Sequence, residues 1–128
     1  MSGMVVGIGR ITLRLDEIAS LKEKRGIVRR LIDRAQNRFN ASIAEVGDLD
    51  SKRSVQIGVS VVSNDRRHAD RMLASVIEFI DAQGLAVVYD QSTELVTSGD
   101  DDPVHGRSLA SRQRSRGDAF WKDIDGGE

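Results

Sequence analysis

Residues 54–65 read SVQIGVSVVSND and hold the plainest secondary-structure signals in the chain. Over residues 54–61, apolar side chains at odd positions alternate with small or polar ones at even positions. A period of two is typical of a strand with one buried face, so we predict a strand over 54–61. The Ser-Asn-Asp run at 63–65 then offers three good helix N-caps. This stretch therefore predicts a strand that leads directly into a helix.

On the carboxyl side, a buried stripe at helical spacing supports the predicted helix. The stripe consists of Ala69, Met72, Leu73, Val76, Ile77 and Ile80. Gly84 follows this stripe, at the position where a residue with a left-handed backbone conformation commonly ends a helix. Residues 85–89 then form an apolar strand, and residues 91–96 either extend it or make a short hairpin.

On the amino side, residues 4–15 predict a strand whose apolar parity is set by Ile11, Leu13 and Leu15. Gly7 and Gly9 share that parity, which indicates a bulge or a closely packed helix. Further along, Ser20 and Glu23 have the spacing of a capping box, so a helix begins at Leu21 and runs to about Arg38. Its apolar stripe is Leu21, Val28, Leu31, Ile32, Ala35 and Phe39. Residues 41–47 predict another strand, and residues 47–51 a polar turn in which Asp48 and Asp50 are solvated.

The predicted order is βαββαβ. Two amphipathic helices and strands with one polar face indicate an α+β fold, the ferredoxin-like sandwich, with both helices on one face of an antiparallel sheet. Right-handed crossovers give the strand order 4-1-3-2.

Composition limits the class of protein. The chain has 128 residues, a net charge of −1, 4% aromatic residues and no cysteine, which indicates one globular domain with an aliphatic core and neither disulfides nor thiolate chemistry. No apolar run approaches the roughly 20 residues of a membrane-spanning helix, and residues 1–4 lack the features of a signal peptide. We therefore expect a cytoplasmic protein that does not enter membranes.

The chain divides near residue 97. Residues 1–96 carry 14 basic and 13 acidic side chains and form the predicted domain. Residues 97–128 carry 5 basic and 7 acidic side chains and few apolar ones, so we predict a mobile tail. Phe120 and Trp121 near its end are a candidate anchor for a protein partner or for the domain itself.

Five short blocks also resemble a known bacterial family, the YlxP-like family. They are Met4-Val5-Val6-Gly7, residues 20–25 (SLKEKR), Arg38-Phe39-Asn40, Ala44-Glu45-Val46 and residues 61–65 (VVSND). The resemblance covers residues 4–96 and implies a small cytoplasmic ferredoxin-like protein. Genes of this family often lie beside those of translation and ribosome-maturation factors, which implies a role near the ribosome. The family has no established catalytic residues.

The first predicted helix is the main candidate site. Between residues 22 and 38 it carries seven basic and two acidic side chains. Arg30, Arg34 and Arg38 form a row on one flank, and Lys22, Arg25 and Arg29 line the other. Such rows can follow a phosphate backbone, so these six residues are the candidate nucleic-acid contacts. The competing interpretation is a solvated helix face on which Asp33 pairs with Arg29 or Arg30.

The sheet face away from the helices is the second candidate surface. It is predicted to be bare and to present Arg10, Thr12, Arg14, Ser54, Gln56, Gly58 and Ser60. Because it lacks aromatic residues, base stacking of the RNA-recognition type is excluded. A flat face of small polar residues instead favours pairing with a second copy, so a homodimer is expected.

No pattern of metal ligands, catalytic groups or cofactor-binding residues stands out. The two histidines, His68 and His105, lie in different segments. The leading hypothesis is a non-enzymatic accessory factor that binds RNA or a ribosomal particle. The alternatives are a homodimeric adaptor that uses the sheet face and the tail, and a small-ligand regulatory domain.

Overall fold

The computed structural model describes residues 3–16, 18–99 and 110–115, the last of these as backbone only. Its elements in chain order are β1 (Met4–Arg14), α1 (Leu21–Arg38), β2 (Ser42–Gly47), β3 (Ser54–Ser63), α2 (Arg66–Ala82), β4 (Val87–Ser98) and β5 (Ala110–Ser115). The predicted order βαββαβ is confirmed, with one further strand.

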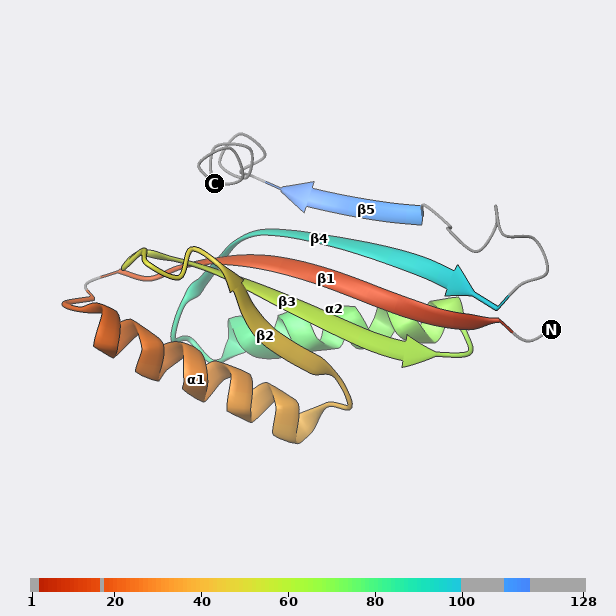
Figure 1. Ribbon diagram of the computed structural model, residues 1–128, viewed down its shortest axis with the longest axis horizontal. Helices are drawn as coiled ribbons and strands as arrows, with labels where there is room; N and C mark the ends of the chain where they lie inside the picture. The colour runs from red at the N-terminus through yellow and green to blue at the C-terminus, as the bar shows by residue number, and fades with distance from the viewer. Residues whose placement is uncertain (1–2, 17, 100–109, 116–128) are drawn as a thin grey trace.

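All strands belong to one antiparallel sheet in the order β2-β3-β1-β4-β5 (Figure 1). Without β5 this is the predicted order 4-1-3-2, so the ferredoxin-like α+β fold is confirmed. Both helices pack on the same face of the sheet. The opposite face, called the open face below, has no helix over it in the part of the chain that the structure describes.

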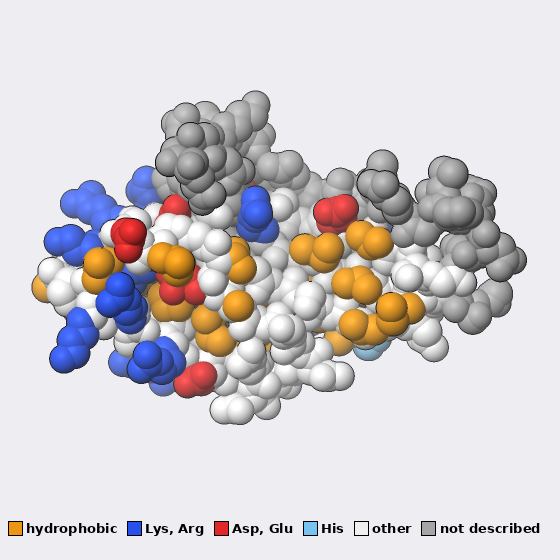
Figure 2. Space-filling view, in the orientation of Figure 1, with side chains coloured by type: hydrophobic (Ala, Val, Ile, Leu, Met, Phe, Trp, Pro, Cys, Tyr) orange, Lys and Arg blue, Asp and Glu red, His pale blue; other side chains and the backbone are white. Residues whose placement is uncertain are grey.

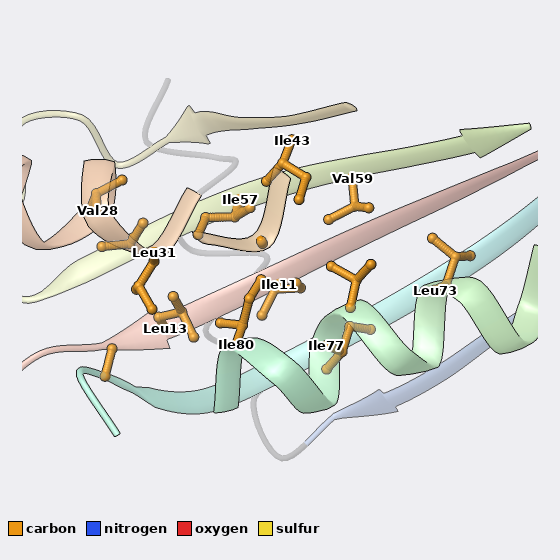
Figure 3. Packing of buried hydrophobic residues seen from close by; sticks show 14 of the residues in the cluster. Ile11, Leu13, Val28, Leu31, Ile43, Ile57, Val59, Leu73, Ile77 and Ile80 are labelled. Carbon is orange, nitrogen blue, oxygen red and sulfur yellow. The ribbon is translucent and has the colours of Figure 1, made fainter. Parts of the chain in front are cut away.

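The core lies between the helices and the sheet and is aliphatic (Figure 3). Ile11, Leu13 and Ile57 from the sheet meet Leu31 of α1 and Ile80 of α2. All five side chains are at most 1% exposed. The core is thus built from branched aliphatic side chains in close contact, as the low aromatic content of the sequence predicted.

Gly7 brings α2 close to the sheet. A β-carbon at this position would lie 2.9 Å from Val61 Cγ2 and 3.0 Å from Leu73 Cδ1. The predicted alternative of a closely packed helix is therefore confirmed, because no larger residue fits between β1, β3 and α2.

The ends of both helices agree with the capping residues in the sequence. The helix α1 begins and ends where predicted, with Ser20 Oγ accepting a hydrogen bond from Glu23 N at 3.1 Å. The helix α2 is capped by Asp65, and Gly84 beyond it has the left-handed φ of 71°. The last predicted strand is extended rather than folded into a hairpin: β4 is continuous to Ser98.

The strand β5 was not expected. It pairs with β4 from Leu95–Ala110 to Asp90–Ser115, within the segment predicted as a tail. Phe120 and Trp121 lie outside the described residues, as does His105.

The prediction for the open face is wrong in part. Thr12, Ser54 and Gln56 are not exposed but 0%, 7% and 3% accessible. The loop that follows β2 explains two of them, because Asp48 Oδ2 accepts hydrogen bonds from Ser54 Oγ at 2.6 Å and from Gln56 Nε2 at 3.5 Å. The other half of the face carries exposed apolar side chains instead of polar ones, including Met4 and Ile8.

Candidate nucleic-acid interface

One basic side chain of α1 belongs to the interior. Lys24 is fully buried, in line with Val28, Leu31 and Ala35 on the face that α1 turns to the sheet. Lys24 is one of the seven basic side chains of this helix but not one of the six candidate contacts, and its burial was not predicted. Lys24 lies four residues before Val28 and seven before Leu31, which is the spacing of a buried helical stripe. This spacing could have predicted that Lys24 is buried.

The buried ammonium of Lys24 has two partners from the edge of the sheet. Its Nζ lies 3.4 Å from Glu45 Oε2 on β2, and it donates a hydrogen bond to the backbone oxygen of Asp48. A buried charge needs this kind of compensation, since an unpaired one is very costly. The pair therefore joins the start of α1 to the end of β2.

The loop after β2 is shaped around Asp48. This residue has the left-handed φ of 60°, and its backbone oxygen also accepts from Ser51 N at 3.1 Å. Its carboxylate turns to the opposite face and binds Ser54 and Gln56. Asp48 was predicted to be a solvated turn residue, but it organises the loop. Because Lys24 holds Asp48, the start of the loop lies beside the first turn of α1. Lys52 and Arg53 follow in the same loop and are exposed, and the backbone oxygen of Arg53 accepts a hydrogen bond from Leu15 N at 2.8 Å.

All six predicted contacts on α1 are exposed, but they differ in surroundings. On the first flank, Arg34 donates from Nη1 to Gln83 Oε1 at 2.8 Å. The Arg38 guanidinium lies 5.4 Å from the centre of the Phe79 ring and 5.8 Å from that of Phe39. These contacts tie Arg34 and Arg38 to α2 and to the end of their own helix, whereas Arg30 has no such partner within the described residues.

The cations of the other flank make no such contacts in the part of the chain that the structure describes. Lys22, Arg25 and Arg29 form no ion pair or hydrogen bond of their side chains within residues 3–16 and 18–99. Asp33 forms no ion pair there either, so the neutralising pairs with Arg29 or Arg30 are absent. On this side, Gln36 Nε2 donates to the backbone oxygen of Ile43 in β2 at 2.9 Å, which places the flank along the free edge of the sheet.

Five exposed cations of α1 and the β2–β3 loop lie toward one end of the molecule, which we call the basic end, with Arg14 of β1 next to Arg53. They are Lys22, Arg25 and Arg29 from α1 and Lys52 and Arg53 from the β2–β3 loop. Figure 2 shows the Lys and Arg side chains concentrated at the end where α1 begins. Exposed acids at the same end are Asp16, Glu23 and Asp50. Lys52 and Arg53 were missed because only the tertiary contact of Lys24 brings their loop to α1.

Acidic side chains gather between α2 and β4. A hollow of about 290 Å³ lies between them, with Asp70, Glu78 and Asp81 on its α2 side and Gln91 and Thr93 on its β4 side. Carboxylates repel phosphates, so this hollow is an unfavourable contact for a polyanion.

The described residues hold no group of three or more His, Asp or Glu side chains placed to bind a metal ion. His68 is exposed on α2. Across the same ranges, no helix is long and apolar enough to cross a membrane.

Comparison with known proteins shows the family of the chain. The family model described as "Protein of unknown function (DUF503)" matches residues 6–93, more than two-thirds of the chain. The chain belongs to the DUF503 family. A curated relative, "Uncharacterized protein YlxP" of Bacillus subtilis (strain 168), is 35% identical over 78 residues, which cover 61% of this chain and 85% of the relative. The family resemblance found in the sequence is thereby confirmed.

The DUF503 match extends from β1 to the middle of β4 and includes Lys24, Glu45 and the basic end, whereas β5 lies outside it. Among solved structures, "De novo designed protein Foldit4" is similar with a TM-score of 0.42 and 14% identity, over 76% of this chain and 98% of that one.

Proposed function

We propose that this DUF503 protein is a non-enzymatic accessory factor that binds RNA or a ribosomal particle through its basic end. The observation that carries the proposal is the set of five exposed cations brought together from α1 and the β2–β3 loop. The three on α1 have no competing carboxylate partner within the described residues.

The spacing of these cations suits a phosphate chain. Lys22, Arg25 and Arg29 are three and four residues apart on a helix, so neighbouring side chains are about 5–6 Å from each other. Successive phosphates of a single strand lie at a similar spacing, and each contact displaces condensed counterions. Recognition of this kind is electrostatic and largely independent of sequence.

The structure favours a different row of α1 as the phosphate contacts from the row that the sequence favoured. Arg30, Arg34 and Arg38 were the favoured row, but Arg34 and Arg38 would have to give up contacts with Gln83 and Phe79 before binding a phosphate. We therefore assign the contacts first to Lys22, Arg25 and Arg29, with Arg30 beside them.

Sedimentation through a sucrose gradient tests the proposal. Lysate of cells that make the full chain is centrifuged at low and at moderate salt, and the protein is located by blotting. We expect wild type to migrate with ribosomal particles at low salt and to leave them as salt rises. Arg25→Glu/Arg29→Glu should remain at the top, because repulsion replaces attraction at the centre of the basic end.

The matched control is Arg67→Glu/Arg71→Glu on the exposed surface of α2, which changes the net charge equally. This control should migrate like wild type. The proposal is refuted when wild type stays at the top of the gradient at both salt concentrations, or when both variants are displaced equally.

A further inference from the structure

The open face carries a group of apolar side chains at the end opposite to the basic end. This apolar patch consists of Met4, Val6 and Ile8 on β1, Val62 on β3 and Val96 on β4. Met4, Ile8 and Val62 are 47%, 41% and 59% exposed. Figure 2 shows hydrophobic side chains gathered over β1 and β3 toward the end of the sheet where the N-terminus lies. The solvated face of an antiparallel sheet is ordinarily polar, so a patch of this kind marks a contact surface.

The strand register arranges the patch symmetrically. Val6 pairs with Val62 on one side and with Val96 on the other, which makes a row of three valines across the sheet. Met4 and Ile8 lie two residues before and after Val6 on the same face of β1. A half-turn about the row of valines therefore brings every apolar side chain of the patch over another apolar side chain.

We infer that the patch binds the same patch of a second copy of this chain, with the two-fold axis along the row of valines. Val6 of one copy then faces Val6 of the other, and Met4 faces Ile8. Ser98 and Glu94, which flank the patch on β4, also face each other across the interface. Such a contact is isologous, because the same surface is used by both partners.

Charge and size both support this arrangement. Arg10 lies two residues beyond Ile8 on the open face and falls outside the overlap, so no like charges meet among the described residues. The two basic ends point in opposite directions, away from the interface. From strand geometry the patch measures roughly 13 Å along β1 and 10 Å across three strands between Cα atoms. With its side-chain border it offers about half of the roughly 800 Å² per partner in a standard interface, so the dimer is weak and depends on concentration.

Sedimentation velocity of the full chain over a range of concentrations tests the inference. Wild type should shift from monomer to dimer as concentration rises. Ile8→Asp places a charge on the patch and should remain monomeric at every concentration. The control is Ala44→Asp, on the same face but on the edge strand β2, which should dimerise like wild type. Circular dichroism checks that both variants are folded.

A chemical cross-link tests the position of the axis. The chain contains no cysteine, so a single one reports one site. With a short bismaleimide, Val6→Cys should give a covalent dimer and Ala44→Cys should not. The inference is overturned when wild type is monomeric throughout, when Ala44→Asp is as monomeric as Ile8→Asp, or when both cysteines cross-link equally. None of these outcomes bears on the proposed function, which is tested at the other end of the molecule.

Discussion

Neutralising two arginines of the basic end should change how RNA binding depends on salt. When each of the five cations of the basic end contacts one phosphate, each contact to single-stranded nucleic acid contributes about −0.7 to the slope of log K against log salt. Wild type should thus have a slope of about −3.5, and Arg25→Gln/Arg29→Gln about −2.1. Between 0.1 and 0.2 M salt, affinity should fall about 11-fold for wild type and about 4-fold for the variant.

The same slopes predict the loss of affinity at a single salt concentration. Two missing contacts at 0.1 M salt weaken binding about 25-fold when the lines are extrapolated to 1 M. Fluorescence anisotropy of a labelled single-stranded RNA, titrated with the full chain at five or six salt concentrations, measures both quantities.

Two controls separate a local contact from a general charge effect. Arg67→Gln/Arg71→Gln on α2 removes the same charge from an exposed site and should leave the slope unchanged. Arg34→Gln/Arg38→Gln should change it less than the first pair, because these arginines already contact Gln83 and Phe79. Equal slopes for wild type and Arg25→Gln/Arg29→Gln would refute the assignment of the contacts.

Further predictions concern stability and are measured by urea denaturation. Gly7→Ala should destabilise the protein by about 1–3 kcal/mol, because its new methyl group meets Val61 at 2.9 Å. Gly26→Ala on α1 is the matched control: nothing lies within 4 Å, so helix propensity should make it stabilising by up to about 1 kcal/mol. Glu45→Ala should cost about 3 kcal/mol, since it leaves the fully buried Lys24 ammonium with only a backbone oxygen. Lys24→Met in the Glu45→Ala background should recover part of that loss, and no recovery would contradict the role given to the buried charge.

The basic residues of α1 differ in their contacts, and this difference shows what helical periodicity can and cannot predict. It separates the two flanks of α1 correctly, because residues three or four apart share a helix face. It does not reveal which flank meets α2, since that depends on how the helices pack. Arg34 therefore contacts Gln83, 49 residues away, while Arg29 has no partner within the described residues. A preference for Arg29 over Arg34 as a phosphate contact could therefore not be predicted from the sequence alone.

The open face shows the limit of the period-two argument. The parity of β1 is clear at Ile11 and Leu13, where the intervening residues are polar. At Val5 and Val6 both parities are apolar, so alternation does not reveal that Val6 faces away from the core. Pairing with Val62 and Val96 decides it, and pairing is a property of the assembled sheet.

The order of elements from β1 to β4, the ends of α1, a helix cap within residues 63–65 and the left-handed turn at Gly84 were determined by the sequence itself. Each follows from interactions between residues a few positions apart, which local pattern encodes. The burial of Lys24 against Glu45, the arrival of Lys52 and Arg53 beside α1 and the row of valines were decided only by the tertiary structure. These features join residues far apart in the chain, and their contacts exist only once strand register and helix packing are established.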